Sequence, residues 1–566
     1  MCPRASCPLI TLGAAMQAIP LLALALTLAA CGGGSSSNTA ATSTNYTVGG
    51  TISGLTVSSL VLVNGTATVT ISEGVTSWVF PTTFVAGSSY SVKVQTQPTG
   101  ELCAITGGAS GTNTGDVANV TVVCGFGQWT WQEGLSSANA SGVYGMQGTA
   151  AAGNLPGARY SSISWTDSSG SLRLFGGVGY DSTGTSGYLN DLWQYTPSTK
   201  QWTWVSGGNV ANASGVYGSQ GTAAAGNLPG ARYSASSWTD SSGNLWLFGG
   251  TGYDSTGALG SLNDLWRYSP STGLWTWVAG AIGDNVSGVY GTKGTASASN
   301  LPGARYSANS WTDSSGNLWL FGGYGYDAAG AAGTLNDLWR YSPSTGLWTW
   351  VNGGNGNNAT GVYGTVTTAA ATNVPGARYA ASSWTDSSGN LWLFGGFGYD
   401  STGAAGRLND LWQYSPSSGQ WTWVSGEDGA NAAGIYGTLG TAVAGDVPGA
   451  RQAASSWIDS SGNLWLFGGV GYDSTGAVGN LGDLWEYSPS SAQWIWVSGA
   501  DGANASGIYG TLGTASVGNA PGGRNSLSSW IDSSGNFWLF GGVGYDSTGG
   551  LGYLNDLWKY TPNTGS

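Results

Sequence analysis

A segment of 73 residues recurs six times without insertion or deletion, and this repeat restricts the possible folds more than any other feature of the sequence. A fixed long period is the signature of a repeat architecture, in which each unit buries its apolar residues against its neighbours. Every copy opens with a tryptophan in a Trp-x-Trp motif. These tryptophans are Trp129, Trp202, Trp275, Trp348, Trp421 and Trp494.

Each repeat predicts four short strands. In the second repeat we expect them at residues 231–239, 244–250, 263–269 and 274–278, where β-branched and aromatic residues are concentrated. The turn sequences Asp-Ser-Ser-Gly and Ser-Pro-Ser-Thr-Gly make two of the links tight, whereas the other two links are long. Four short strands per repeat are typical of a propeller blade, so the array at residues 126–566 predicts an all-β, six-bladed β-propeller. Because strand direction alternates, both long links should lie on one face.

The last repeat ends before its fourth strand, and a matching strand stands at the start of the first repeat. We expect residues 128–132 to pair with residues 555–561 and to complete the sixth blade. This pairing would remove an open sheet edge, which otherwise favours aggregation.

The repeat resembles the kelch family, including its galactose-oxidase-like branch. The resemblance rests on a double glycine after an apolar strand, the motif Asp-Leu-Trp-Arg-Tyr, a nearby proline and the following tryptophan. In the second repeat these are Gly249 and Gly250, residues 264–268, Pro270 and Trp275. The period exceeds the roughly 50 residues expected for kelch repeats because the link between blades is long. The resemblance implies that arginines near the channel mouth bind acidic ligands.

Residues 1–30 resemble a bacterial lipoprotein signal peptide, with an apolar stretch that leads into the lipobox-like sequence Leu-Ala-Ala-Cys. The resemblance implies cleavage before Cys31, lipidation of that residue and a lipid anchor in the membrane. Gly32 after the cysteine is compatible with sorting to the outer membrane or cell surface. An ordinary cleaved leader and a single membrane span remain the alternatives, and the start codon stays open between Met1 and Met16.

Two further segments separate this leader from the repeats. Residues 31–44 are rich in Gly, Ser and Thr and predict a flexible tether. Residues 45–125 contain short alternating runs that predict a small antiparallel β domain. This domain is similar to the Ig-like modules that precede repeat arrays in bacterial surface lipoproteins, and we interpret it as a spacer. Cys103 and Cys124 are expected to form a disulfide there, with two free thiols as the alternative.

The composition excludes several classes of function. The chain has no histidine, which removes the usual general base, the commonest metal ligand and the ligands of a copper galactose oxidase site. We therefore expect no metal and no cofactor. A net charge of −13 argues against binding to nucleic acid. The composition does not exclude a glycosidase or lyase that uses Asp and Glu, because two carboxylic acids suffice for glycoside hydrolysis.

Two groups of residues are candidates for ligand binding. Each repeat carries an arginine in a Pro-Gly-Ala-Arg or Pro-Gly-Gly-Arg motif, which either binds an acidic ligand at the channel mouth or pairs with an aspartate such as Asp264. Residues that differ between repeats are better candidates for specificity, above all Tyr324 and Arg407. The six arginines are Arg159, Arg232, Arg305, Arg378, Arg451 and Arg524, and the other variable residues noted are Lys293, Phe397, Glu427 and Asp428.

Recurring aspartates and tyrosines allow two interpretations each. Asp240 and Asp254 occupy turn sequences, where aspartate commonly accepts backbone hydrogen bonds, but oxygen-rich loops also bind calcium. Tyr217 and Tyr253 either pack the long links or offer a surface for stacking on sugars. These features together predict a non-catalytic scaffold that binds a glycan or protein partner through its long-loop face. A carbohydrate-active enzyme and a purely structural protein are the alternatives.

Overall fold

The structure is a computed structural model in which the described part of the chain is all-β. These residues form strands, turns and irregular links and contain no helix. No helix of the described part could therefore cross a membrane. The predicted signal peptide, its Cys31 and all of the tether except Thr44 lie outside the described residues. The structure describes residues 44–55, 59–98, 103–124, 127–167, 169–437, 439–440, 442–516 and 518–562.

Residues 45–124 form a small β unit with its own core. Two four-stranded sheets, β5-β2-β10-β8 and β4-β3-β7-β9, enclose a single cluster that includes Leu62 and Val120, both fully buried. Cys103 and Cys124 lie opposite each other in β8 and β10 and form the expected disulfide. The strands are β1 (Asn45–Tyr46), β2 (Val48–Ser53), β3 (Leu60–Asn64), β4 (Ala67–Ile71), β5 (Ser77–Val79), β6 (Phe84–Val85), β7 (Ser89–Thr96), β8 (Cys103–Gly107), β9 (Ser110–Thr112) and β10 (Val117–Cys124).

Each 73-residue repeat builds a three-stranded sheet and, together with the Trp-x-Trp strand that opens the next copy, a four-stranded antiparallel sheet. In the second repeat these are β18-β19-β22-β23 and β17-β20-β21. In the first and fourth repeats two long strands run through both sheets, as β14 and β15 do in the first. The strands of the first two repeats are β12 (Arg159–Tyr160), β13 (Ile163–Thr166), β14 (Leu172–Tyr180), β15 (Ser186–Thr196), β16 (Gln201–Ser206), β17 (Arg232–Tyr233), β18 (Ser236–Thr239), β19 (Leu245–Phe248), β20 (Thr251–Tyr253), β21 (Leu259–Ser261), β22 (Leu265–Ser269) and β23 (Leu274–Ala279).

The remaining repeats follow the same order. The third repeat contains β24 (Arg305–Tyr306), β25 (Asn309–Thr312), β26 (Leu318–Phe321), β27 (Tyr324–Tyr326), β28 (Ala332–Thr334), β29 (Leu338–Ser342) and β30 (Leu347–Asn352). The fourth contains β31 (Arg378–Tyr379), β32 (Ser382–Thr385), β33 (Leu391–Tyr399), β34 (Ala405–Ser415) and β35 (Gln420–Ser425). The fifth contains β36 (Arg451–Gln452), β37 (Ser455–Ile458), β38 (Leu464–Phe467), β39 (Val470–Tyr472), β40 (Val478–Asn480), β41 (Leu484–Ser488) and β42 (Gln493–Ser498). The sixth contains β43 (Arg524–Asn525), β44 (Ser528–Ile531), β45 (Phe537–Phe540), β46 (Val543–Tyr545), β47 (Leu551–Tyr553) and β48 (Leu557–Thr561).

The three-stranded sheet is the main difference from the sequence prediction. The segment expected as one strand at residues 231–239 is divided at Ser234, whose φ of 53° lies in the left-handed region. The next strand ends at Phe248 because Gly249 and Gly250 have φ of 67° and 91°, which glycine adopts without strain. The long link that follows contains the hairpin β20–β21, which pairs with β17.

The two ends of the repeat array pair with each other. Strand β11 (Gln128–Glu133) lies antiparallel to β48, with Trp131 opposite Trp558. It supplies the outer strand of the last four-stranded sheet, β11-β48-β45-β44. The expected contact between residues 128–132 and the sixth repeat is therefore present.

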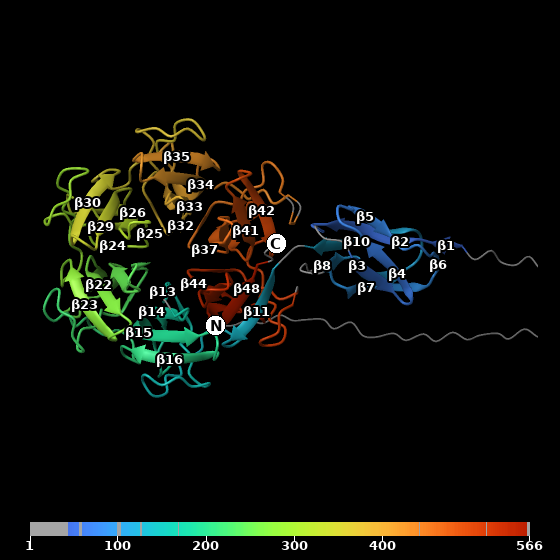
Figure 1. Ribbon diagram of the computed structural model, residues 1–566, viewed down its shortest axis with the longest axis horizontal. Helices are drawn as coiled ribbons and strands as arrows, with labels where there is room; N and C mark the ends of the chain where they lie inside the picture. The colour runs from blue at the N-terminus through green and yellow to red at the C-terminus, as the bar shows by residue number, and fades with distance from the viewer. Residues whose placement is uncertain are drawn as a thin grey trace, which may run out of the picture. The chain divides into compact units, whose positions relative to one another are not determined.

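A cycle of backbone hydrogen bonds links all six repeats. One residue per repeat, between the two parts of the divided first strand, donates its N–H to the carbonyl of its counterpart in the preceding repeat over 2.7–2.9 Å. The first of them, Ser161, donates to Ser526 of the last repeat, so the cycle is closed. The sheets accordingly surround a central opening (Figure 1). The cycle consists of Ser161, Ser234, Ser307, Ala380, Ala453 and Ser526.

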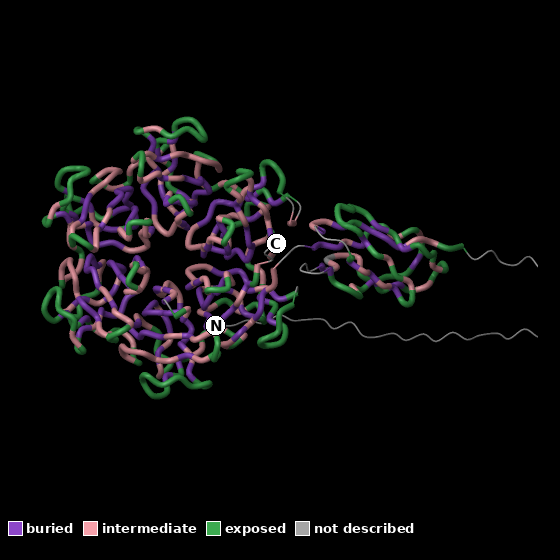
Figure 2. The backbone as a smooth tube through the Cα atoms, in the orientation of Figure 1, coloured by how far each residue is buried: buried purple, intermediate pink, exposed green. Residues whose placement is uncertain are grey.

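Neighbouring repeats share their hydrophobic cores. One cluster joins Trp165 of the first repeat to Leu247 and Trp266 of the second, all at most 4% exposed. The indole N–H of Trp238 also donates to the carbonyl of Trp319 in the next repeat, at 3.0 Å. In each repeat the buried segments lie toward the middle of its sheets, and the exposed links lie at the outer rim of the ring (Figure 2). Most of the repeated tryptophans are thus core residues rather than an exposed stacking surface.

Two partly buried glutamates make stability depend on pH. Burial raises the pKa of Glu486 to about 7, and Asp459 adds to the effect. Burial also raises the pKa of Glu133 to about 7, although Lys200 opposes it. These carboxyls bind their protons more tightly in the folded state than in the unfolded state. Their contribution to stability is therefore lost as pH rises and the protons dissociate. The free energy of unfolding should therefore fall between about pH 4.5 and pH 7.

Glu486→Gln tests this dependence, because the fourth repeat carries Gln413 at the corresponding position. We expect the variant to be more stable by about 1–3 kcal/mol at pH 7.5. This gain is smaller than the whole pKa shift would give, because the carboxyl is partly exposed. At pH 4.5 the two proteins should be equally stable. Urea unfolding at both pH values measures the difference, and an equal gain at both would contradict the assignment.

Candidate functional site

The arginines of the repeated motif are buried in ion pairs. In the second repeat the side chains of Arg232 and Asp264 are both 0% exposed. Nη1 and Nη2 of Arg232 donate to the two carboxylate oxygens at 2.7 and 2.8 Å. Nε and Nη1 also donate to the carbonyls of Gly230 and Gly249. The guanidinium thereby ties the start of the first strand to the third strand of its own repeat.

The same arrangement recurs in every repeat and corrects the proposed ligand-binding role of these arginines. A guanidinium that is fully buried and bound to a carboxylate does not reach the channel mouth, so pairing with aspartate is the interpretation that the geometry supports. The pairs are Arg159 with Asp191, Arg232 with Asp264, Arg305 with Asp337, Arg378 with Asp410, Arg451 with Asp483 and Arg524 with Asp556.

The recurring turn aspartates and the first recurring tyrosine are also structural. Asp254 accepts hydrogen bonds from Thr256 and from the amide of Ala258, within its own turn. Burial would raise the pKa of Asp254, but these hydrogen bonds outweigh it and hold the pKa below its usual value. Tyr217 is 5% exposed and donates to Asp264 at 2.6 Å. No three His, Cys, Asp or Glu side chains of the described part are placed to hold a metal ion.

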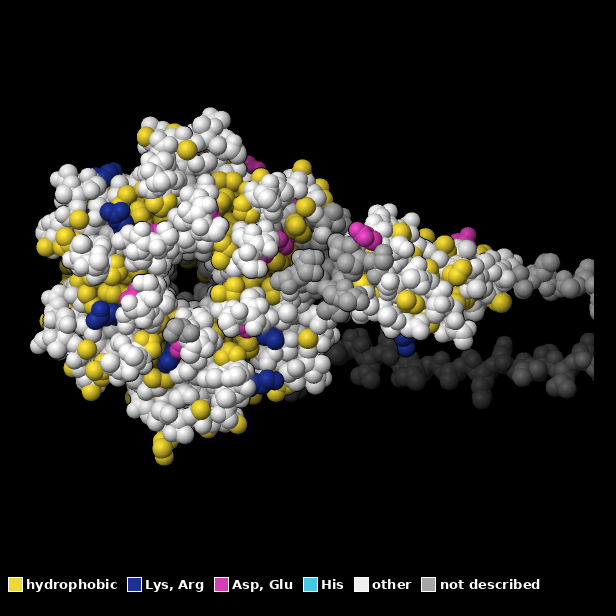
Figure 3. Space-filling view, in the orientation of Figure 1, with side chains coloured by type: hydrophobic (Ala, Val, Ile, Leu, Met, Phe, Trp, Pro, Cys, Tyr) yellow, Lys and Arg dark blue, Asp and Glu magenta, His cyan; other side chains and the backbone are white. Residues whose placement is uncertain are grey.

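A cavity of about 420 Å³ opens at the start of the first strands, and we call it the channel mouth. The residues of the hydrogen-bond cycle line it. Four of the residues that immediately precede them also line it, namely Tyr160, Tyr233, Tyr379 and Gln452. The view along the ring axis shows the central opening and a surface with few charged side chains (Figure 3).

The small sheets present one uniform and one variable face. In cross-strand register, Arg232 lies beside Gly252 and Gly260, and every repeat has the same Arg-Gly-Gly row. The adjacent row points to the opposite face and differs in all six repeats. These variable triplets are Tyr160, Val178 and Tyr188; Tyr233, Thr251 and Ser261; Tyr306, Tyr324 and Thr334; Tyr379, Phe397 and Arg407; Gln452, Val470 and Asn480; and Asn525, Val543 and Tyr553.

Aromatic residues of successive triplets form a continuous arc. The ring centroids are 4.9 Å apart between Tyr553 and Tyr160, and 6.4 Å apart between Tyr160 and Tyr233. The arc continues with 6.3 Å from Tyr233 to Tyr306 and 6.3 Å from Tyr306 to Tyr379. It therefore passes through the sixth, first, second, third and fourth repeats.

Amide side chains occupy the remaining part of the ring. Gln452 and Asn525 stand where the other repeats have tyrosine. Nδ2 of Asn525 donates to Oδ1 of Asn480 at 2.7 Å, which joins the fifth and sixth triplets. The triplets thus offer aromatic faces along most of their ring and hydrogen-bonding amides along the rest.

The structure brings the two variable candidates Tyr324 and Arg407 into neighbouring triplets. Tyr324 is 36% exposed, and its ring lies 5.5 Å from that of Tyr306 and 6.2 Å from that of Tyr379. Burial raises the pKa of Tyr379, although the Arg407 guanidinium and a hydrogen bond with Gln452 lower it. Nε of Arg407 is buried and has no hydrogen-bond partner among the described residues.

The other variable candidates divide between this arc and other places. Phe397 belongs to the arc, with its ring 5.5 Å from Tyr379. Lys293 instead donates to the carbonyl of Gly353 at 2.7 Å and lies over the ring of Trp350. Asp428 accepts a hydrogen bond from Ser401, and Glu427 lines a separate cavity.

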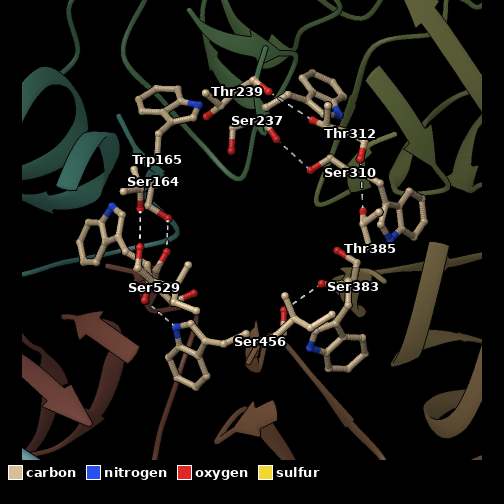
Figure 4. A pocket seen from close by; sticks show the side chains of 18 residues that line it. Ser164, Trp165, Ser237, Thr239, Ser310, Thr312, Ser383, Thr385, Ser456 and Ser529 are labelled. Atoms are coloured by element: carbon tan, nitrogen blue, oxygen red, sulfur yellow. Dashed lines mark hydrogen bonds between the residues drawn. The ribbon is translucent and has the colours of Figure 1, made fainter. Parts of the chain in front are cut away.

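Deeper in the ring, a second cavity of about 390 Å³ is lined by a Ser-Trp-Thr or Ser-Trp-Ile segment from each repeat (Figure 4). Several of its hydroxyl groups donate to backbone carbonyls of the neighbouring repeat, as Ser310 does to Ser237 at 3.1 Å. Ile458 and Ile531 replace the threonine in two repeats. Neither this lining nor that of the channel mouth includes a carboxylate, so these two cavities offer no acid pair for hydrolysis.

Sequence reasoning identified three members of the variable triplets and missed the rest. The missing signal was alternation: Tyr160 directly follows the buried Arg159, so its side chain points to the opposite face. Comparison with known proteins yields no family model that matches the chain and no curated protein similar to it. What this site does must therefore be argued from its own residues.

Proposed function

We propose that residues 126–566 form a six-bladed β-propeller of the kelch type, and that its channel mouth binds a glycan or protein partner without catalysis. The observation that carries this proposal is the set of six different triplets on small sheets whose opposite face carries the same Arg-Gly-Gly row in every repeat. Residues that only maintain the fold are repeated, as the Arg-Gly-Gly row is. Variation on one face of a small sheet whose other face is uniform is what a recognition surface requires.

The chemistry of the mouth favours a glycan over a protein. Tyrosine rings stack on the apolar faces of sugars, and their hydroxyls and the nearby amides exchange hydrogen bonds with sugar hydroxyls. Burial raises the pKa of Tyr306 to about 12, and nearby Tyr233 and Tyr379 contribute, so its hydroxyl is neutral at physiological pH. Arg407, the one guanidinium in the triplets, suits an acidic group on the glycan.

The proposal extends to the cellular setting that the sequence indicates. The chain would be exported, lipidated at Cys31 and held at the outer membrane or cell surface, with residues 31–44 as tether and residues 45–125 as an Ig-like spacer. The alternative of a carbohydrate-active enzyme with Asp and Glu as catalytic residues gains no support from the residues that line the mouth.

A glycan array with the folded protein, followed by calorimetry on the best ligand, tests the proposal. We expect Tyr306→Gln with Tyr379→Gln to weaken binding by about tenfold or more, because two stacking surfaces are lost. The fifth repeat already carries Gln452 at this position, so the fold should tolerate the change. Asp501→Asn, an exposed change outside the triplets and the lining of the channel mouth, is the control and should bind normally. An empty array, or undiminished binding by the double variant, would contradict the proposal.

A further inference from the structure

Five of the six repeats fasten their long link with the same asparagine amide. In the second repeat, Nδ2 of Asn227 donates to the carbonyl of Trp275 at 3.2 Å and to that of Thr222 at 2.9 Å. Next to this contact, Ala224 forms an isolated β-bridge with Trp275. The corresponding asparagines are Asn154, Asn227, Asn300, Asn373 and Asn519.

The fifth repeat has Asp446 at this position, and the fastening is lost. A carboxylate has no N–H to donate to the carbonyl of Trp494, the counterpart of Trp275. Val443 and Trp494, both in the described part of the chain, do not form the β-bridge that Ala224 and Trp275 form. The fifth repeat thus lacks these two contacts, although the amide of Gly440 still donates to the carbonyl of Trp496 at 2.7 Å.

Asp446 is buried, and one of its carboxylate oxygens has no partner among the described residues. The residue is 6% exposed, and its Oδ2 accepts no hydrogen bond from the described residues. The amide oxygens of Asn300 and Asn373 also lack partners, so what distinguishes Asp446 is the lost donor and the added negative charge. Burial raises the pKa of Asp446, as expected for a carboxylate without a counter-charge.

A cavity of about 480 Å³ lies beside this carboxyl group. Glu427 lines the same cavity and is also peculiar to the fifth repeat. Ser491, Gln493 and Trp494 contribute further oxygen-bearing groups to its lining. The residues that correspond to Glu427 in the other repeats are Leu135, Gly208, Ala281, Gly354 and Ala500.

We propose that Asp446 and Glu427 bind one calcium ion in this cavity, together with oxygen atoms of Ser491, Gln493 and Trp494. Two carboxylates supply the charge that balances a divalent cation, and all the candidate ligands are oxygens, which calcium prefers. Calcium also accepts irregular coordination from loops, whereas magnesium demands a near-ideal octahedron. The ion would occupy the place of the missing amide donor and add a contact between the link and the strand.

Calcium titration of the full chain, after removal of metal with EDTA, tests the site directly. Calorimetry should give one site with a dissociation constant on the order of 10⁻⁴ to 10⁻³ M, as in extracellular calcium modules. The melting temperature should rise with calcium and rise less with magnesium. A protein that shows neither binding heat nor a thermal shift at millimolar calcium would overturn the proposal, as would equal responses to the two ions.

Asp446→Asn is the decisive variant, because it restores the residue that the other repeats carry. It should abolish calcium binding and, in EDTA, melt at a higher temperature than the natural protein, since the amide again donates to the carbonyl of Trp494. Glu427→Ala, which copies Ala281 and Ala500, should weaken binding by about tenfold. Persistence of the full calcium response in Asp446→Asn would show that the ion binds elsewhere.

Asn373→Asp in the fourth repeat is the matched control. It introduces the same buried carboxylate, but Gly354 stands where the fifth repeat has Glu427. We expect this variant to melt at a lower temperature and to gain no second calcium site. Appearance of a second site would show that the aspartate alone suffices and would overturn the role given to Glu427. The calcium titrations do not involve the channel mouth, so their outcome does not depend on whether the mouth binds a glycan.

Discussion

Asp337→Asn is expected to lower the free energy of unfolding by about 3–5 kcal/mol. The carboxylate accepts hydrogen bonds from both terminal nitrogens of Arg305 at 2.6 and 2.8 Å, from the hydroxyl of Tyr290 at 2.6 Å and from the indole of Trp339 at 2.7 Å. The side chain of Arg305 is 0% exposed, so its charge would remain buried without a counter-charge. An amide of the same shape cannot supply that charge, and its N–H₂ would face donors.

Guanidinium chloride unfolding followed by circular dichroism measures this loss. Asp501→Asn changes an exposed aspartate and should shift stability by no more than about 0.5 kcal/mol. Asp410→Asn, the equivalent change in the fourth repeat, should cost as much as Asp337→Asn because its contacts are the same. A loss below about 1 kcal/mol in both variants would mean that these ion pairs contribute little to the fold.

Removing β11 is expected to have a still larger effect. This strand pairs with β48, and its Trp129 packs against Phe467 and Tyr560 at ring-centroid distances of 5.2 and 5.0 Å. Loss of that tryptophan alone costs about 3–5 kcal/mol. Deletion of residues 128–133 also leaves β48 as an open edge, so we expect aggregation during purification as well as a lower melting temperature.

A chain in which residues 128–133 are moved and not deleted shows whether the loss of this strand itself causes the instability. Residues 128–133 can be moved to follow Ser566, where the sequence already resembles the turn that precedes the fourth strand in other repeats. We expect the moved strand to pair with β48 from the other end of the chain and to restore a monomer with nearly normal stability. Size-exclusion chromatography and thermal unfolding provide the comparison. Equal behaviour of the deleted and rearranged chains would contradict the importance of this pairing.

The sequence predicted those parts of the fold that depend on periodicity. The strand around Trp246 and the strand around Trp275 could be located because apolar and aromatic residues mark them. The pairing of β11 with β48 followed from the position at which the last repeat ends. The small sheet could not be anticipated, because Ser234 adopts a left-handed conformation that nothing in its residue type demands.

The candidate site was predictable only in part, because the direction of a side chain in a short strand depends on backbone geometry. Arg232 and Tyr233 are adjacent in a two-residue strand, so their side chains point to opposite faces. The arginine was the more conspicuous residue in the sequence, yet the tyrosine is the one that borders the mouth. Comparison of the six repeats did single out Tyr324 and Arg407. The sequence does not reveal the role of Asp446, because its missing hydrogen bond and the cavity beside it are properties of packing.

The closed cycle of hydrogen bonds uses only backbone atoms, and this makes the protein a suitable scaffold for directed evolution. Ser161 and Ala380 occupy equivalent places in the cycle, so its geometry does not depend on side-chain identity there. The neighbouring triplets already tolerate tyrosine, glutamine or asparagine at their first position. A library that randomises the six triplets would change the contents of the mouth while the Arg-Asp pairs and the shared cores stay intact. Selection for new ligands could then proceed without the loss of stability that usually accompanies it.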